Sequence, residues 1–212
     1  MRKVISFSLW GDNPKYTIGA IKNSEIAPFI YPDWETWFYV ADNVPREIIE
    51  KLKQSGSKII NKNNEDWDGM FWRFYPMSDP SVDIFISRDT DSRLNYRERR
   101  AVDAWIDSGK KLHIMRDHRY HGTPVLGGMW GFRGSTSDIR DQIDDFIKDT
   151  GKSGYYDVDQ FFLRSIIYTK YKEDSIAHDE FFDGIPFPSP REGQEYVGAP
   201  FDAFNNREIP FV

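Results

Sequence analysis

Apolar and polar residues along the first 60 positions form alternating blocks that predict a repeated strand–helix unit. Short apolar runs at 4–10, 36–40 and 58–60 have the length and composition of strands. Between them, residues 14–27 and 44–54 carry apolar side chains at helical spacing, separated from the strands by turn residues. Because a β-α-β-α-β order is typical of a parallel sheet covered by helices, we expect an α/β fold.

The rest of the chain continues this pattern with longer polar segments between the elements. We expect Pro28 to end the first helix, and the prolines from residue 185 onward to keep that segment without regular structure. The other predicted elements are a polar loop at 61–68, a buried aromatic helix at 69–75, strands at 82–86, 112–115 and 176–179, and helices at 95–108, 137–150 and 156–168.

The strand predicted at 82–86 leads directly into two carboxylates, Asp89 and Asp91. The chain has two more Asp-x-Asp patterns, at 66–68 and 157–159, but neither directly follows an apolar strand. Open α/β sheets bind ligands at the carboxyl ends of their strands, and two close carboxylates favour a divalent cation between them. We therefore expect a Mg²⁺, Mn²⁺ or phosphate site here, with a solvated turn as the alternative.

Two further stretches carry candidate chemistry. Arg73 lies in the aromatic run, and a buried arginine usually has a carboxylate partner, for which the Asp89/Asp91 pair is the nearest candidate. An arginine at a helix edge is the alternative. Residues 116–121 then bring an aspartate, two arginines and two histidines to a strand end, followed by a Gly-Gly-Met-Trp sequence that would let the backbone approach a sugar.

Two residues near the end of the chain have open interpretations. Asp159 opens a predicted helix, so its carboxylate either caps that helix or has a functional role. His178 lies at a predicted strand end, where a single histidine is more often an ordinary surface or core residue than a ligand.

Length, composition and charge limit the domain count, the partners and the cellular location that we expect. With 212 residues we expect one domain, and the apolar ending at Pro210-Phe211-Val212 suggests a fragment of a longer protein. A net charge of −6 without a basic block argues against nucleic acid, and an acidic protein that binds an anionic nucleotide needs a metal to bridge the charges. The chain has no cysteine, no signal peptide and no apolar run that would span a membrane, so we expect a soluble, cytoplasmic protein.

Six ordered motifs resemble a small group of GT-A glycosyltransferases that includes the N-terminal domain of a large chlorella-virus protein and bacterial relatives. They are Phe7-Ser-Leu-Trp-Gly11, Gly69-Met-Phe-Trp-Arg-Phe74, Arg88-Asp-Thr-Asp-Ser-Arg93, His113-Ile-Met-Arg-Asp-His118, Leu126-Gly-Gly-Met-Trp-Gly131 and Pro190-Arg-Glu-Gly193. The resemblance implies a Rossmann-like, mostly parallel sheet, with residues 1–95 as the nucleotide-binding half and 96–212 as the donor-sugar and acceptor half. It also implies that the protein is virus-encoded, in which case it would lie in the host cytoplasm.

The resemblance implies a role for each matching residue. Asp89 and Asp91 would bind Mn²⁺ or Mg²⁺ against the donor diphosphate, with His178 completing the metal shell. Asp159 would act as the base in an inverting enzyme or orient the sugar in a retaining one, although Asp-Val-Asp-Gln departs from the Glu-Asp of the family. Nucleotide contacts are expected from Phe7, Ser8, Leu9, Trp10, Tyr16, Arg73, Asp89 and Thr90, and sugar contacts from Asp117, Gly127, Gly128, Trp130 and Gln160.

We therefore expect a metal-dependent transfer of a hexose or deoxyhexose from a UDP-sugar to a hydroxyl of a glycan or another acceptor. The rival enzyme is a haloacid-dehalogenase-like phosphohydrolase with Asp89 as nucleophile and Asp91 as acid/base, which would need Asp144 and Asp145 as its later acidic pair. A non-catalytic sugar-binding module with Trp130 as a stacking platform is the third class.

Overall fold

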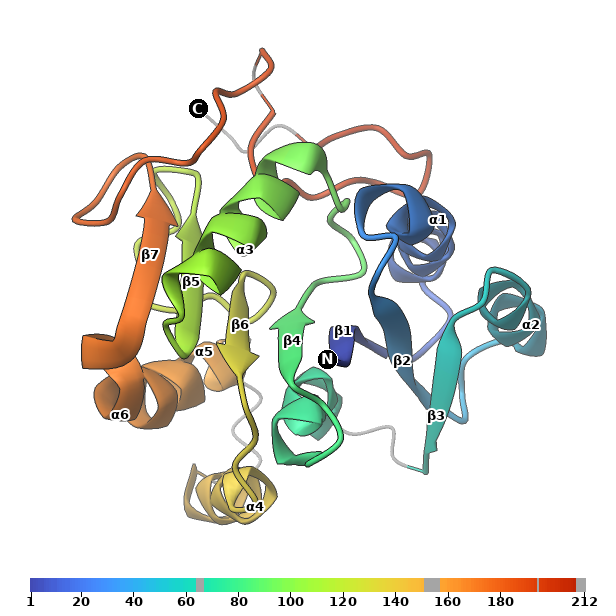
Figure 1. The fold of residues 1–212 in the computed structure, drawn as a ribbon. Helices are drawn as coiled ribbons and strands as arrows, with labels where there is room; N and C mark the ends of the chain where they lie inside the picture. Colours follow the sequence, from blue (N-terminus) through green and yellow to red (C-terminus); the bar gives the residue numbers. More distant parts are fainter. Residues whose placement is uncertain (64–66, 151–156, 194, 209–212) are drawn as a thin grey trace.

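The computed structural model describes residues 1–63, 67–150, 157–193 and 195–208 (Figure 1). A seven-stranded sheet forms its centre, in the order β3-β2-β1-β4-β6-β5-β7. The strands are β1 (Lys3–Leu9), β2 (Glu35–Ala41), β3 (Lys58–Lys62), β4 (Ile84–Ser87), β5 (Leu112–Arg116), β6 (Trp130–Arg133) and β7 (Ser175–Asp179). All neighbouring strands are parallel except β6, which runs antiparallel to both β4 and β5. The predicted mostly parallel α/β sheet is confirmed.

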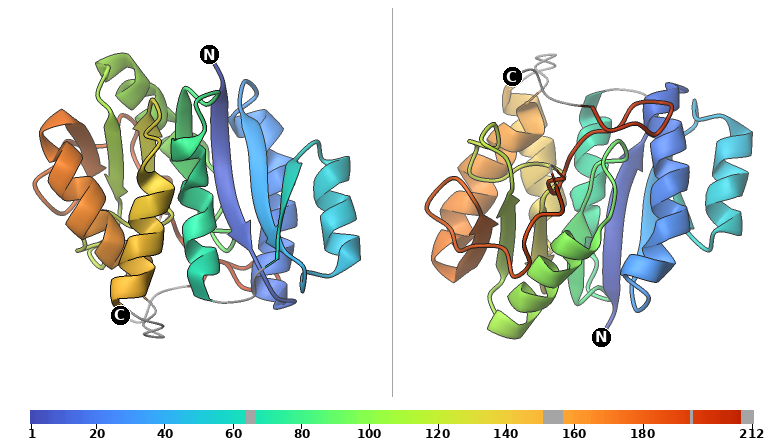
Figure 2. Two further views of the ribbon diagram at one scale, coloured as in Figure 1. Left: turned by 90° about the horizontal axis from the view of Figure 1, so that it is seen from below. Right: turned by 90° about the horizontal axis from the view of Figure 1, so that it is seen from above.

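Helices cover both faces of the sheet (Figure 2). The helices are α1 (Pro14–Ile30), α2 (Arg46–Gln54), a 3-10 helix (Trp67–Ser78), α3 (Tyr96–Ser108), α4 (Ile139–Thr150), α5 (Val158–Phe162), a π-helix (Leu163–Tyr168), α6 (Thr169–Tyr171) and a 3-10 turn (Lys172–Asp174). Among the described helices, none is long and apolar enough to cross a membrane.

Side chains along each strand alternate between the two faces of the sheet, so the apolar ones pack into two separate cores. On β1, Ile5, Phe7 and Leu9 pack towards α1, α2 and α3, whereas Val4 packs on the opposite face with the 3-10 helix, α4 and α5. The serines at positions 6 and 8 therefore point to the second face, where Ser8 meets the 3-10 helix through a hydrogen bond from the Arg73 amide. This alternation sends the two serines, rather than Phe7, towards the Arg73 side of the sheet.

Three local predictions differ from the structure. Pro28 does not end α1, which continues to Ile30 because a proline in the last turn removes only one backbone donor. The expected helix at 69–75 is a 3-10 helix that extends through Pro76 to Ser78. Strand β6 was not predicted, because its Gly131 has low strand propensity. A Cβ at Gly131 would lie 2.9 Å from the Phe85 carbonyl oxygen and 3.0 Å from Trp105, so close strand packing requires the glycine.

Two fully buried histidines make the stability of the fold sensitive to acid. His113 Nε2 and His178 Nδ1 lie 2.9 Å apart, so one ring nitrogen donates and the other accepts. Burial lowers the pKa of His178 to about 4, and burial together with the neighbouring imidazole of His178 and the charge of Arg88 lowers the pKa of His113 well below its usual value. Both imidazoles are therefore neutral in the folded protein at neutral pH.

We expect the free energy of unfolding to fall as the pH drops from 6.5 towards 4. In this window the unfolded chain protonates these histidines but the folded protein does not, so each contributes a loss of up to about 1.4 kcal/mol per pH unit. Urea denaturation at pH 7.0 and 5.5 measures the slope, and a His113→Phe/His178→Leu variant should show a shallower one. An equal slope in the variant would contradict the assignment.

Candidate functional site

A cavity of about 350 Å³ opens at the carboxyl ends of β1 and β4. Its walls come from the end of β1, the 3-10 helix, the loop after β4, the loop before β6, the start of α5 and the C-terminal segment. The lining residues are Ser8, Leu9, Trp10, Tyr16, Met70, Arg73, Asp89, Thr90, Asp91, His121, Leu126, Gly127, Met129, Asp159, Gln160, Gly198 and Pro200. Because β6 is antiparallel, its amino-terminal end brings the Gly127 loop to this same edge.

Buried side chains of α1 and α3 hold the loop that carries Asp89 and Asp91. From α1, the Asn23 side-chain amide donates to the Thr90 and Ser92 carbonyl oxygens at 3.2 and 2.8 Å. From α3, the Glu98 carboxylate binds the buried Arg88 guanidinium at 3.1 Å and accepts from the Tyr31 hydroxyl at 2.9 Å. The two aspartates are therefore presented on a fixed backbone.

Arg73 connects the Asp89 carboxylate to a second acid across the cavity. Its guanidinium forms ion pairs with Asp89 and, at 2.8 Å, with Asp159 Oδ2. Its backbone amide donates to Ser8 Oγ at 3.0 Å, which fixes the 3-10 helix against the end of β1. The predicted carboxylate partner of Arg73 is confirmed, and the sequence did not indicate the second partner.

Asp91 carries negative charge that its neighbours compensate only in part. Burial raises its pKa, the nearby charge of Asp89 raises it further, and Lys15, whose ammonium lies 3.4 Å from Asp91 Oδ2, opposes both. Because the pKa is raised on balance, the ionised carboxylate lacks favourable partners in the protein alone. The Asp89/Asp91 pair is thus suited to an additional cation.

Asp159 lies near the start of α5 with almost no exposure to solvent. Burial raises its pKa, the Arg73 guanidinium lowers it, and the charge of Asp89 raises it again, for a net increase. Its Oδ1 accepts from the Gln160 amide at 2.8 Å, so the side chain is oriented into the cavity wall. A buried carboxylate with a raised pKa is a typical candidate for proton transfer.

Gly127 and Gly128 pack directly on these acids. A Cβ at Gly127 would overlap Asp159 and Arg73, and a Cβ at Gly128 would overlap the Asp89 carboxylate. The Gly127 carbonyl oxygen also accepts from the buried Ser87 hydroxyl at 2.7 Å, which holds the loop against the end of β4. The backbone of this loop therefore forms the floor of the cavity beside Asp89 and Asp159.

We expect Gly128→Ala to weaken any binding of Mn²⁺ at the Asp89/Asp91 pair at least tenfold and to destabilise the fold by about 1–3 kcal/mol, as overpacked substitutions do. The added methyl group would lie 2.9 Å from the Asp89 amide nitrogen, so the backbone as well as the carboxylate must shift. Calorimetric titration and urea denaturation measure the two effects. Gly122→Ala is the matched control, because nothing lies within 4 Å of its Cβ position; equal behaviour of the two variants would contradict the expectation.

The structure brings most of the predicted nucleotide residues to the cavity: Ser8, Leu9, Trp10, Tyr16, Arg73, Asp89 and Thr90 line it, as do Asp91, Gly127, Asp159 and Gln160. Gly128 packs beside it on Asp89. Phe7 does not reach it, because its ring is fully buried and stacks on Phe38 with centroids 4.8 Å apart.

Two other predicted ligands are core residues. Trp130 is fully buried between Phe74 and Phe85, with ring centroids 5.2 and 5.1 Å away, so it presents no face to a sugar. His178 packs on His113 beneath the sheet edge and does not line the cavity. Both residues lie on strands whose inward direction the sequence pattern did not reveal.

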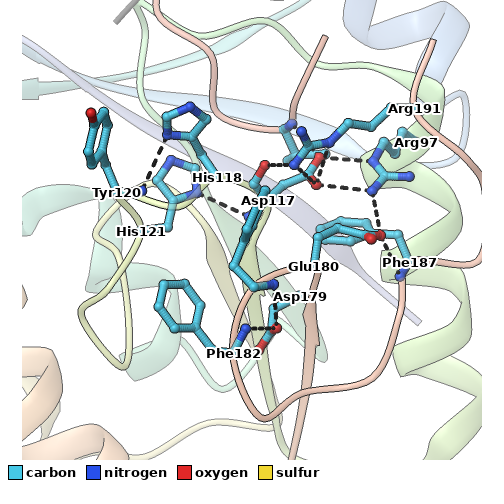
Figure 3. Close-up of polar contacts among 12 residues, drawn as sticks. Arg97, Asp117, His118, Tyr120, His121, Asp179, Glu180, Phe182, Phe187 and Arg191 are labelled. Carbon is cyan, nitrogen blue, oxygen red and sulfur yellow. Dashed lines mark hydrogen bonds and ion pairs between the residues drawn. The ribbon is translucent and has the colours of Figure 1, made fainter. Parts of the chain in front are cut away.

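Asp117 is also placed differently from its predicted sugar-binding role (Figure 3). It is fully buried, and its carboxylate accepts from Arg97 at 2.8 and 3.0 Å, from Arg191 at 2.9 and 3.1 Å, and from the Val197 amide at 2.9 Å. These donors use both of its oxygen atoms, and Asp117 does not line the cavity. Its observed role is to attach the C-terminal segment to the end of β5.

Residues 185–193 and 195–208 form what we call the C-terminal strap, which crosses the carboxyl edge of the sheet (Figure 1). Besides the Asp117 contacts, the Phe201 amide donates to the Asp91 carbonyl oxygen at 2.8 Å, and Glu208 binds Lys15 at 2.8 Å. Gly198 and Pro200 of the strap form one wall of the cavity. No sequence signal indicated these two residues, whereas His121 lies in the charged cluster at 116–121 that we had singled out.

The carboxylates at the cavity could hold a divalent cation. Asp89 and Asp91 supply two carboxylates, and the charge of Asp91 is compensated only in part, which suits Mg²⁺ or Mn²⁺. Within the described part of the chain, no three histidine or acidic side chains gather as a metal-binding group. The remaining ligands of an ion would therefore come from water or from a bound ligand, an arrangement usual for Mg²⁺.

The sequence matches no protein-family model and no curated protein sequence. Among solved structures, a nucleotide-diphospho-sugar transferase from Desulfovibrio desulfuricans G20 is similar at 13% identity, with 88% of this chain and 84% of that chain covered and a TM-score of 0.52. A glycosyltransferase involved in glycosylation of the major capsid of PBCV-1 matches at 15% identity, with 84% and 82% covered and a TM-score of 0.49.

Glucosyl-3-phosphoglycerate synthase from Mycobacterium tuberculosis, in complex with Mn²⁺, UDP-glucose and phosphoglyceric acid, matches at 12% identity, with 72% and 67% covered and a TM-score of 0.42. The expected closeness to the viral enzyme is not borne out, since 15% identity marks a distant likeness. The order of strands, the helices on both faces and the likeness to the Desulfovibrio protein show that the chain has the GT-A fold of nucleotide-diphospho-sugar transferases.

Proposed function

We propose that this chain is a metal-dependent glycosyltransferase that moves a hexose or deoxyhexose from a UDP-sugar to a hydroxyl of a glycan or another acceptor. One observation carries the proposal. In a GT-A fold, the cavity at the carboxyl edge combines the Asp89/Asp91 pair with Asp159 on the opposite wall, a buried carboxylate whose pKa is raised and which Arg73 connects to Asp89. In this proposal, residues 1–95 hold the nucleotide and residues 96–212 hold the sugar and the acceptor.

The wall next to β1 suits the nucleotide. Trp10 and Tyr16 offer aromatic faces for a base, and Ser8 and Thr90 offer polar atoms beside it. A diphosphate that approaches Asp89 and Asp91 meets repulsion from both carboxylates, which a divalent cation bound to them would remove. When bound there, Mn²⁺ or Mg²⁺ would stabilise the negative charge that develops on the leaving diphosphate.

The residues of the chain itself supply the rest of the chemistry. Lys15 and Arg73 lie beside Asp91 and Asp89, so their cations can turn towards the diphosphate once the metal neutralises the two carboxylates. If the reaction inverts the configuration at the anomeric carbon, Asp159 would accept the proton of the acceptor hydroxyl as the new glycosidic bond forms. If it retains the configuration, Asp159 would orient the donor sugar.

The phosphohydrolase alternative has little support in the geometry. Its later acidic pair would have to be Asp144 and Asp145, but both are exposed on the surface of α4 and neither lines the cavity. The sugar-binding module loses its stacking platform, because Trp130 is buried in the core.

Calorimetric titration with UDP, first with Mn²⁺ present and then with the metal chelated, tests the proposal. We expect micromolar binding that disappears on chelation and returns when Mn²⁺ is restored. A panel of UDP-sugars, assayed for UDP release, then identifies the donor. Absence of UDP binding under both conditions would overturn the proposal.

A further inference from the structure

Exposed aromatic side chains gather beside the cavity, on the loops that follow β5 and β7. Tyr120 is 60% exposed, Phe181 48% and Phe182 38%. We call these three residues, together with the partly exposed His118, the aromatic ledge. Exposed aromatic groups of this kind are typical of interaction surfaces.

The ledge is continuous with the cavity. His121 lines the cavity, and its ring centroid lies 5.8 Å from that of His118 (Figure 3). From His118, the rings of Tyr120 and Phe181 follow at 5.1 and 6.4 Å. A molecule that reacts in the cavity and extends past His121 would therefore pass directly over the ledge.

The ledge is also held in place before any ligand arrives. The amides of Phe181 and Phe182 donate to Asp179 Oδ1 at 3.2 and 2.8 Å, which fixes the turn that carries both rings. Arg191 lies 5.2 Å from the Phe181 ring and Arg116 lies 4.9 Å from the Phe182 ring. Binding on a surface that is already ordered loses little conformational entropy.

The charge of the ledge distinguishes between possible ligands. The two arginines beside its phenylalanine rings are neutralised, Arg116 by Asp179 at 2.7 Å and Arg191 by Asp117 at 2.9 Å. Among the residues that the structure describes, Arg119, 5.6 Å from the Tyr120 ring, is left as a single further cation beside the ledge rings. An anionic lipid surface or a phosphate chain would require free cations in larger number. A neutral carbohydrate needs only aromatic faces for its C–H groups and polar neighbours for its hydroxyls, which the ledge offers.

We propose that the aromatic ledge is an acceptor subsite that binds a neutral polysaccharide or oligosaccharide chain next to the reacting sugar. This inference rests on the proposed glycosyltransferase function and adds to it the class of acceptor. The reacting hydroxyl would lie in the cavity near Asp159, and the neighbouring sugar units would stack on Tyr120 and Phe181. A small hydroxyl compound would leave the ledge unused.

Affinity electrophoresis in gels that contain laminarin, dextran, galactomannan or xylan tests the ledge without any donor. We expect at least one polysaccharide to retard the protein. Phe181→Ala and Tyr120→Ala should each raise the dissociation constant about tenfold, the size expected for loss of one aromatic stacking contact. Phe29→Ala is the matched control, because Phe29 is 74% exposed on α1, outside the cavity and the ledge, and should leave retardation unchanged.

Three outcomes would overturn the ledge proposal. These are no retardation by any of the four polysaccharides, unchanged retardation of a Phe181→Ala/Tyr120→Ala double variant, and binding to phosphatidylserine vesicles that this double variant abolishes. The proposed function is tested separately, because the double variant should bind UDP with Mn²⁺ as the unmodified protein does. Loss of polysaccharide transfer with intact UDP binding supports the subsite, whereas absence of UDP binding in both proteins overturns the proposed function.

Discussion

Substitution of Asp117 by alanine should lower the free energy of unfolding by about 3–5 kcal/mol, the usual effect of removing one partner from a buried ion pair. The carboxylate is fully buried and accepts hydrogen bonds from Arg97, Arg191 and the Val197 amide. Without it, two guanidiniums lose a carboxylate partner, and of its hydrogen bonds to residue 117 the strap keeps only the one from Arg191 to the backbone carbonyl oxygen. Urea denaturation measures the stability, and limited proteolysis should show faster cleavage within 185–208.

Glu180→Gln is the control for this experiment. Glu180 binds the same Arg97 at 2.8 Å, but it lies closer to solvent, so its loss should change stability by less than about 1 kcal/mol. Asp117→Asn preserves the shape and removes only the charge, and it should fall between the two. A stable Asp117→Asn variant with altered donor preference would instead favour the sugar-binding role suggested by the sequence.

Asp91→Asn should abolish Mn²⁺-dependent UDP binding, with a loss in affinity of at least about 100-fold, or roughly 3 kcal/mol. The substitution removes one of the two carboxylates that could hold the cation, and the diphosphate then meets Asp89 without a full counter-charge. Calorimetric titration with UDP and Mn²⁺ measures the loss. A lectin that binds sugars without a metal would not show it.

The same substitution should leave the free protein at least as stable as before. Because the pKa of Asp91 is raised in the folded state, its ionised form opposes folding at neutral pH, and the neutral amide removes this effect. Thermal denaturation without metal should therefore give an unchanged or slightly higher midpoint. Asp145→Asn on α4 is the matched control and should change neither the affinity for UDP nor the midpoint of thermal denaturation. A lower midpoint for Asp91→Asn would show that its effect on binding is structural.

Much of the fold could be predicted from the alternation of apolar blocks. Strands β1, β2, β3 and β4 and helices α2 and α3 lie within a few residues of their predicted positions, because each has an apolar face with a clear period. Strand β6 was missed for a tertiary reason. Its glycine, unfavourable in an isolated strand, is required only because Trp105 and β4 lie so close to it.

The residues of the candidate site could also be predicted only in part. Residues in the last positions of a strand or just after it, such as Ser8, Asp89 and Asp91, reach the cavity because the sheet edge itself places them there. Asp117, Trp130 and His178 also lie at or near strand ends, but their side chains turn into the protein. The position of a residue at a strand end does not determine whether its side chain points into the cavity or into the core. In the sequence, an aspartate that binds two distant arginines cannot be told from one that binds a ligand.

The cavity is lined by residues that lie far apart in the sequence, because the strap supplies one of its walls. Lining residues extend from Ser8 at the beginning of the sequence to Pro200 near its end, so the last wall is added only after the sheet that it covers. During synthesis the nucleotide side would take shape first, and a partly made chain would present two charged aspartates without an enclosed pocket. Under the proposed function, competence to bind a donor should therefore arise only when the strap docks.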